Sequence, residues 1–298
     1  MKNFAEIIQA AKTKGPCKIV VAGGESKNIL IALEDARKEG IAEITLVGNI
    51  KKIKELLQGL PLKISQFELE EAFTPEDCAN LALQFILEGK AKVLMKGSVS
   101  TSTLMHAILA HKEKILLSKH ISHIFVAEVP NYHKLLFVTD GGIIPHPTLE
   151  EKVSIINNAI LFASRLGIPQ PRIAIIGPSE EVSPKIPETV DAAILNTMAQ
   201  HNQIKEAIID GPLALDVAIN KVAMVTKNIS SPCNGEADIL IVPSVTAGNM
   251  FAKGLLYFAQ AKGGGILAGA NFPIILLSRA DSSEIKFNSI ALAVATSY

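Results

Sequence analysis

Three junctions, each between an apolar run and a helix-like segment, carry the polar residues of this chain that could do chemistry. They are Lys96-Gly97-Ser98-Val99-Ser100-Thr101-Ser102-Thr103, Pro243-Ser244-Val245-Thr246-Ala247-Gly248-Asn249 and Leu277-Ser278-Arg279-Ala280-Asp281-Ser282-Ser283-Glu284. In open parallel sheets, ligands bind at the carboxyl ends of strands, and the free N–H groups of the following helix favour anions. The junctions therefore predict a site for a small anion such as phosphate.

Arg279 is the most informative of these residues. The chain has only three other arginines, and Arg279 directly follows the apolar run 273–277, where a charge needs a partner. A guanidinium suits bidentate phosphate binding. The structural alternative is a pair with Asp281 that holds the turn, and Asp281 with Glu284 also matches a capping box. We predict catalytic roles for Arg279, Ser278 and Asp281, with helix capping left open for Asp281.

Eight further residues are predicted to bind a ligand, although each also has an ordinary structural explanation. They are Lys96, Ser98, Ser100, Thr101, Asp140, Asp210, Gly248 and Asn249. The hydroxyls and the lysine could cradle a phosphate, whereas capping a helix would need only one hydroxyl. Gly248 permits close backbone approach, and Asn249 could orient a ligand. The two aspartates each precede a glycine after an apolar run, which is also common turn chemistry.

Composition excludes several classes of protein. The 298 residues are 48% hydrophobic, and 29 basic and 29 acidic residues leave no basic excess for nucleic acid. The three cysteines form no CxxC motif, so neither a disulfide framework nor a metal site is predicted. The longest uncharged stretch, Gly263 to Ser278, is too broken by glycine and proline to cross a membrane, and it reads as a buried loop plus a strand. Without an export signal, a reducing, cytoplasmic location is expected.

Short apolar runs alternate with helical patterns along the whole chain. The predicted strands are 18–22, 44–47, 92–95, 121–129, 135–138, 173–176, 207–209, 239–242 and 273–277. Capping boxes start helices at Thr74 and Thr148. Continuous apolar strands suit parallel sheets that are covered on both faces, so we predict a two-lobed α/β fold with parallel-rich sheets flanked by helices. A breaker-rich segment at 131–147 suggests a first lobe of 1–133 plus 270–298, a second lobe of 134–269, and an active-site cleft between them.

Taken together, five segments resemble the phosphate acetyl/butyryltransferase family, and the butyryl branch in particular. They are 94–101, 139–148, 209–216, 242–249 and 277–282, and the likeness extends over nearly the whole chain. The resemblance implies the fold of isocitrate and isopropylmalate dehydrogenases. It also implies a reversible reaction in which acyl-CoA and inorganic phosphate give acyl phosphate and CoA. CoA would be a substrate, with no permanently bound cofactor, and the enzyme would be a homodimer or larger.

The resemblance also implies roles for two residues of the third junction. Arg279 would hold the phosphoryl group, and Ser278 would hydrogen-bond the reacting centre. Acetyl-specific members usually read Ser-Arg-Gly-Cys-Ser, followed by an acidic residue six positions after the arginine that acts as base on the CoA thiol. Here Ile285 occupies that position, which favours the butyryl branch. The base stays open between Asp281, Glu284 and a residue of another junction.

Three functions are therefore compared. The first is the acyltransferase, with butyryl or branched-chain acyl groups favoured and acetyl as the alternative. The second is an NAD-dependent decarboxylating dehydrogenase on the same fold, which four arginines and the lack of an acidic metal-binding cluster disfavour. The third is a non-catalytic two-lobed binding protein, which the missing export signal disfavours.

Overall fold

The computed structural model describes residues 1–297 as two compact units. Unit 1 comprises residues 1–3 and 118–263, and unit 2 comprises residues 4–117 together with the chain from Gly264 onward. The sequence had suggested boundaries at 133 and 269. The first boundary lies earlier because the strand Ser122–Glu128 pairs with Leu136–Thr139 and so belongs to unit 1.

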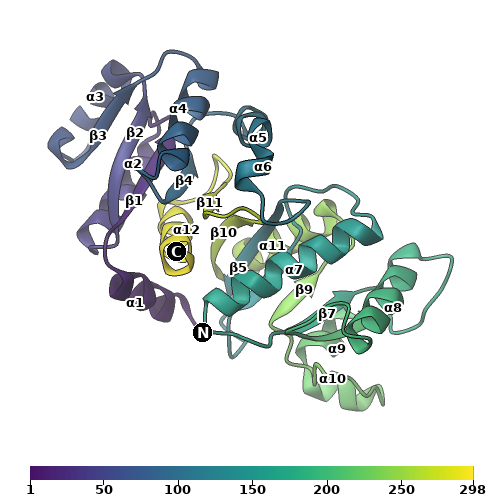
Figure 1. Ribbon diagram of the computed structural model, residues 1–298. Coiled ribbons are helices and arrows are strands. Elements are labelled where there is room, and N and C mark those ends of the chain that lie inside the picture. Colours follow the sequence, from purple (N-terminus) through teal and green to yellow (C-terminus); the bar gives the residue numbers. More distant parts are fainter. Residues whose placement is uncertain (298) are drawn as a thin grey trace. The chain divides into compact units, whose positions relative to one another are not determined.

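Unit 2 is a six-stranded, mostly parallel sheet flanked by helices (Figure 1). Its elements are α1 (Phe4–Lys14), β1 (Cys17–Ala22), α2 (Lys27–Lys38), β2 (Ala42–Gly48), α3 (Ile50–Gln58), η1 (Ile64–Gln66), β3 (Glu68–Glu71), α4 (Pro75–Leu87), β4 (Val93–Lys96), α5 (Thr101–Ala110), α6 (Lys112–Ile115), β10 (Lys262–Ala268), β11 (Ile274–Ile275) and α12 (Ser283–Thr296). The strand order is β3-β2-β1-β4-β11-β10, and only the β11–β10 pair is antiparallel. The helices α1 and α2 both pack against α12.

Unit 1 has a five-stranded sheet with the order β5-β6-β9-β7-β8. Its elements are β5 (Ser122–Glu128), β6 (Leu136–Thr139), α7 (Leu149–Arg165), β7 (Arg172–Ile176), α8 (Pro187–Gln200), β8 (Ile208–Leu213), α9 (Leu215–Ile219), α10 (Lys221–Thr226), β9 (Ile239–Ile241) and α11 (Val245–Phe258). The β5–β6 pair is antiparallel, and the other pairs are parallel. The two units together confirm the predicted α/β class with parallel-rich, helix-flanked sheets.

Every apolar run that was predicted as a strand contains one, because these runs are buried on both faces. In β1, for example, Ile19, Val20 and Val21 are consecutive and fully buried. The apolar core of unit 1 lies between its sheet and its helices and includes Phe125, Leu136, Val138, Leu240 and Met224.

Helix starts follow the predicted capping chemistry. In α4, Thr74 Oγ1 accepts the N–H of Asp77, and Asp77 accepts the N–H of Thr74. In α7, Thr148 and Glu151 exchange the same pair of bonds. Each capping box satisfies two N–H groups that the helix itself leaves without partners.

Two strands were missed, and each lacks the apolar run on which the predictions rested. β3 is an edge strand of acidic sequence that pairs only with β2. β10 begins with a lysine and three glycines and had been assigned to a buried loop. A Cβ at Gly264 would lie 2.8 Å from Leu292 Cδ1, so the packing of α12 on β10 excludes side chains there.

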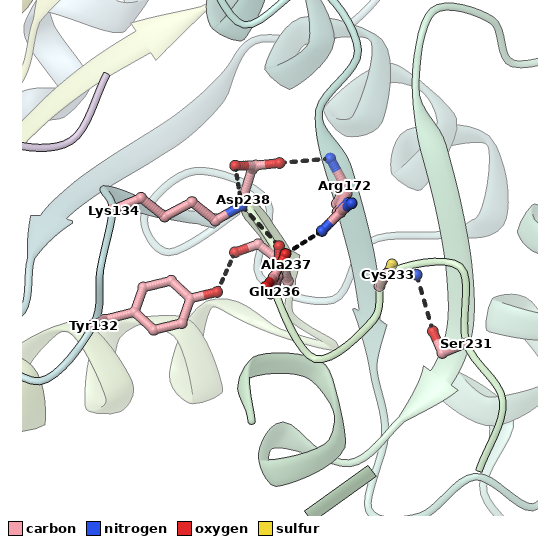
Figure 2. A network of polar contacts seen from close by, with 8 residues as sticks. All are labelled: Tyr132, Lys134, Arg172, Ser231, Cys233, Glu236, Ala237 and Asp238. Atoms are coloured by element: carbon pink, nitrogen blue, oxygen red, sulfur yellow. Dashed lines mark hydrogen bonds and ion pairs between the residues drawn. The ribbon is translucent and has the colours of Figure 1, made fainter. Parts of the chain in front are cut away.

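A network of paired charges lies at the amino ends of β7 and β9 in unit 1 (Figure 2). Lys134 Nζ donates to Asp238 Oδ1 at 2.5 Å and to the carbonyl of Glu236 at 2.7 Å. The other oxygen of Asp238 accepts the N–H of Arg172 at 2.8 Å, and the Arg172 guanidinium pairs with the carboxylate of Glu236. Each cation of the network thus has an acidic partner.

Candidate active site

Three neighbouring parallel strands of unit 2 end at the same edge of the sheet. β4 lies between β1 and β11, with Lys96 opposite Ala22 and Met95 opposite Ile275. The segments that follow these strands in sequence are far apart along the chain, yet the register brings them together. This is the edge at which parallel sheets bind ligands.

A close backbone approach fixes two of these segments. The N–H of Gly97 donates to Ala22 at 2.9 Å, and the N–H of Ser98 donates to Gly23 at 2.7 Å. A Cβ at Gly97 would lie 1.8 Å from the carbonyl oxygen of Gly23, and Gly23 itself has φ +84°. Both positions therefore require glycine.

The three segments, together with α2 and α12, line a pocket of about 260 Å³. Its lining consists of Glu25, Ser26, Ile29, Met95, Lys96, Gly97, Ser98, Leu277, Ser278, Arg279 and Lys286. Four of the predicted site residues thus meet here, namely Lys96, Ser98, Ser278 and Arg279.

Three cations face this pocket. Lys96 and Lys286 are 6% and 2% exposed, whereas Arg279 is exposed. Lys96 Nζ donates to the carbonyl of Val99 at 3.2 Å, and Lys286 Nζ donates to the carbonyl of Asp281. Among the residues that the structure describes, no carboxylate lies within ion-pairing distance of these three cations.

The electrostatics of the pocket follow from this arrangement. Burial lowers the pKa of Lys96, and the positive charges of Arg279 and Lys286 lower it further. Burial also lowers the pKa of Lys286, against a smaller opposing effect of Asp281. A bound anion would relieve both the desolvation and the repulsion, so the pocket is built for negative charge.

The turn after β11 places the guanidinium and a hydroxyl. Arg279 Nη2 donates to the carbonyl of Ser98 at 3.3 Å, which links the turn to the segment after β4. Ser278 Oγ accepts the N–H of Ala280 at 3.3 Å, an arrangement that leaves the hydroxyl proton able to donate. Both side chains can reach a ligand in the pocket.

Asp281 is predicted to be catalytic, and in the structure its carboxylate contacts the backbone of the Ser278 turn. Its Oδ2 accepts the N–H of Ser278 at 2.9 Å, and the residue does not line the pocket. The cap of α12 is Ser282, whose hydroxyl accepts the N–H of Ile285. Asp281 therefore holds the turn of Ser278 and Arg279, and it is not the helix cap.

Glu25 is the carboxylate that lines the pocket, and sequence reasoning did not select it. Its two oxygens accept the N–H of Asn49 at 2.7 Å and the hydroxyl of Ser98 at 2.8 Å. Ser26 and Lys286 were also missed. The Gly-Gly-Glu-Ser run after β1 is a strand-end junction of the kind used for the other candidates, so that signal was present.

Ser100 and Thr101 do not line the pocket. Ser100 is the cap of α5, since its hydroxyl accepts the N–H of Thr103 at 3.0 Å. Thr101 is the exposed first residue of that helix. Capping explains Ser100, and the ligand-binding role of Thr101 stays a prediction.

In unit 1, Asp140 is buried and fully engaged. One oxygen accepts the N–H groups of His123, Gly142 and Ile143, and the other accepts that of Ile144, at 2.8–3.2 Å. Four donors fill the acceptor sites of a carboxylate. Asp140 therefore fixes the loop after β6, and its role in ligand binding stays a prediction.

Asp210 was expected at a strand end, but it lies inside β8, opposite Ala174. Its Oδ1 accepts the side-chain N–H of Asn196 at 3.2 Å and the N–H of Gly211 at 2.9 Å. The apolar run ended at Asp210, whereas the strand continues through Gly211 and Pro212 to Leu213.

Gly248 and Asn249 lie in the first turns of α11, which is capped by Ser244. The Ala-Gly-Asn run at 247–249 is helical. A Cβ at Gly248 would lie 2.9 Å from the Cα of Gly141, so the glycine lets α11 pack on the loop after β6. Asn249 is exposed, and its role in orienting a ligand stays a prediction.

Residues 1–297 hold no group of three or more His, Cys, Asp or Glu side chains arranged to bind a metal ion. Over the same residues, none of the helices combines the length and apolar character that crossing a membrane requires.

Comparison with known proteins places the chain in a family. The family model described as Phosphate acetyl/butaryl transferase matches residues 3–88 and 73–294. The phosphate butyryltransferase of Clostridium acetobutylicum is 39% identical over 98% of this chain and 97% of its own length. The phosphate acetyltransferase of Thermotoga maritima is 35% identical over 97% of each.

A solved structure agrees with these sequences. The branched-chain phosphotransacylase of Enterococcus faecalis V583 superposes with a TM-score of 0.84 and 30% identity, covering 94% of this chain and 98% of that one. Matches of this length and identity show more than a shared fold. The chain is an acyltransferase and belongs to the phosphate acetyl/butaryl transferase family.

Proposed function

We propose that this enzyme transfers a short-chain acyl group reversibly between CoA and inorganic phosphate. The observation that carries the proposal is the pocket of unit 2, where Lys96, Arg279 and Lys286 meet without an ion-paired carboxylate. Cations left without partners in a pocket indicate an anionic substrate, and in this family phosphate is the simplest one.

Arg279 would hold the phosphate while it reacts. A phosphate oxygen attacks the thioester carbonyl carbon, and the tetrahedral intermediate then expels the CoA sulfur as a thiolate, which takes up a proton. The products are acyl phosphate and CoA. A guanidinium presents paired N–H donors to two phosphate oxygens, so it both orients the nucleophile and neutralises charge.

Ser278 would stabilise the oxyanion of the tetrahedral intermediate. Its hydroxyl proton can donate, and its backbone is held in place by the Asp281 carboxylate. A donor positioned before the reaction is worth more than one that must reorganise during it. Asp281 would contribute by fixing this geometry.

Butyryl or branched-chain acyl groups are the favoured substrates. This preference rests on the names of the relatives and on the Ser-Arg-Ala-Asp-Ser sequence at 278–282. Acetyl is the alternative, because an acetyltransferase is also similar over nearly the whole chain. The isocitrate dehydrogenase-like fold, the cleft between lobes, the homo-oligomeric state, the cytoplasmic location and the contacts of unit 1 with CoA stay predictions.

One assay tests the proposal. Release of free CoA thiol is measured from acetyl-, butyryl- and isobutyryl-CoA, each with and without inorganic phosphate. We expect phosphate-dependent release, fastest with the four-carbon substrates. Release that ignores phosphate would indicate a thioesterase, and no release from any of the three substrates would refute the proposal.

A further inference from the structure

Lys286 is the cation that α12 contributes to the pocket of unit 2. It sits in the first turns of α12, and its side chain is 2% exposed and lines the pocket beside Arg279. Its ammonium donates to one backbone carbonyl, that of Asp281. An ammonium has three donors, so this contact leaves capacity for a ligand.

An unpaired buried lysine needs an explanation. Removing an ammonium group from water destabilises the fold by several kcal/mol unless a counter-charge compensates. One carbonyl supplies only part of that compensation. Lys152, the comparable buried lysine of unit 1, has its counter-charge in Asp191 at 2.6 Å. Lys286 has no such partner among the described residues, so it fits a site whose counter-charge arrives with the ligand.

The charges of the pocket define the kind of ligand. Three cations, Lys96, Arg279 and Lys286, face one carboxylate, Glu25. The residues that line the pocket thus carry a net charge of +2, and the Asp281 carboxylate outside the lining offsets part of it at Lys286. A phosphate dianion would supply the remaining negative charge. A neutral ligand would leave the charges of the two buried lysines without this compensation.

We infer that Lys286 is a substrate-binding residue that selects a tetrahedral dianion, acting with Lys96 and Arg279. This inference rests on the proposed function and adds a residue that the family's Ser-Arg pattern does not include. Lys286 would contact the phosphate oxygens on the side of α12, while Arg279 approaches from the exposed turn. Both lysines would hold the anion against the edge of β4.

The test compares Lys286→Met, Lys286→Arg and Lys27→Met. Methionine matches the lysine stem in size and removes the charge. Lys27 is exposed in the first turn of α2, close in sequence to the pocket-lining Ser26, and it controls for long-range charge. For each protein, KM for phosphate, KM for butyryl-CoA, and inhibition by sulfate are measured, with phosphate binding followed separately by calorimetry.

We expect Lys286→Met to raise KM for phosphate and the inhibition constant for sulfate by at least about tenfold, the effect of losing one charge-assisted contact. KM for butyryl-CoA should change by less than about twofold, since the contact is to phosphate. The arginine variant should recover part of the phosphate affinity, and Lys27→Met should behave as the parent. The methionine variant should unfold at the same temperature as the parent or higher, because a buried charge has been removed.

Two results would overturn the inference. One is a folded Lys286→Met variant whose phosphate KM and calorimetric affinity match those of the parent. The other is a methionine variant that fails to fold, because Lys286 would then be a structural residue. If the parent released no CoA but bound phosphate through Lys286, the proposed function would fail and the anion site would stand.

Discussion

Two groups of charged residues at strand ends differ in one respect. In unit 1, at the amino ends of β7 and β9, Lys134 pairs with Asp238, and Arg172 pairs with Glu236 (Figure 2). In unit 2, at the carboxyl ends of β1, β4 and β11, the cations of the pocket have no ion-paired carboxylate among the residues described. Similar residue types are thus ion-paired in unit 1 and have no ion-paired carboxylate in the pocket of unit 2.

The difference separates structural charges from functional ones. For a paired charge inside a fold, the attraction of the partner offsets the cost of desolvation, and the pair links two segments of the chain. An unpaired charge lowers stability and is retained where a ligand supplies the missing charge. The pairing of a charged residue, more than its type or its position after a strand, therefore indicates its role.

Replacing Arg279 with alanine should have the largest effect. We expect kcat/KM for phosphate to fall. The fall should correspond to a loss of about 2–5 kcal/mol in transition-state stabilisation, the scale for losing one partner of a charged, hydrogen-bonded contact. The free energy of unfolding should stay within about 0.5 kcal/mol, because Arg279 is exposed. Arg172→Ala should show the opposite pattern, with lower stability and normal turnover. Near-normal turnover in Arg279→Ala would contradict a functional role for this unpaired cation.

Asp238→Asn should reduce stability without affecting catalysis. The change leaves Lys134 without its carboxylate, and the two side chains are only 17% and 12% exposed. We expect the free energy of unfolding to fall by about 2–4 kcal/mol, somewhat below the range for a fully buried pair. Denaturant titration measures this, and Glu150→Gln, which breaks an exposed pair with Lys119, should lose at most about 1 kcal/mol. A higher KM for phosphate in Asp238→Asn would show that the two groups are not independent.

The smallest effect is a dependence of stability on pH. Because folding lowers the pKa of Lys286 below its ordinary value of 10.5, the unfolded chain binds more protons between the lowered value and 10.5. As pH rises through that window, the parent should gain stability relative to Lys286→Met. Chemical denaturation at several pH values without phosphate should show the difference in free energy of unfolding between the two proteins narrowing as pH rises. A difference in free energy of unfolding that stays constant with pH would indicate that folding does not lower the pKa of Lys286.

Much of the fold could be predicted because its strands are buried on both faces. Runs such as Ile19-Val20-Val21 leave a continuous apolar signal, and the capping boxes at Thr74 and Thr148 mark helix starts locally. β10 could not be found in this way. At Gly264 a Cβ would meet Leu292 of α12, a contact that is set by tertiary packing.

Part of the site could be predicted because the ends of the apolar strands are visible in the sequence. Ser278, Arg279, Lys96 and Ser98 were chosen from their place after strands, and they do line one pocket. Asp140 has an equivalent place after β6, but four backbone N–H groups occupy its carboxylate, and sequence cannot reveal such saturation. Lys286 lies within a helical pattern, where a lysine usually indicates a solvent-facing side chain, so only its burial identifies it.

The position of β11 also bears on how the protein is made. β11 and α12 come from the last part of the chain, yet β11 inserts between β4 and β10 and supplies the turn of Arg279. A growing polypeptide that has reached residue 260 therefore contains β1 and β4 but has neither the strand that completes their sheet nor the arginine. Premature termination should yield a chain with an open strand edge at β4 and no anion pocket. Residues beyond 260 thus supply both the β11 partner of β4 and the arginine of the pocket.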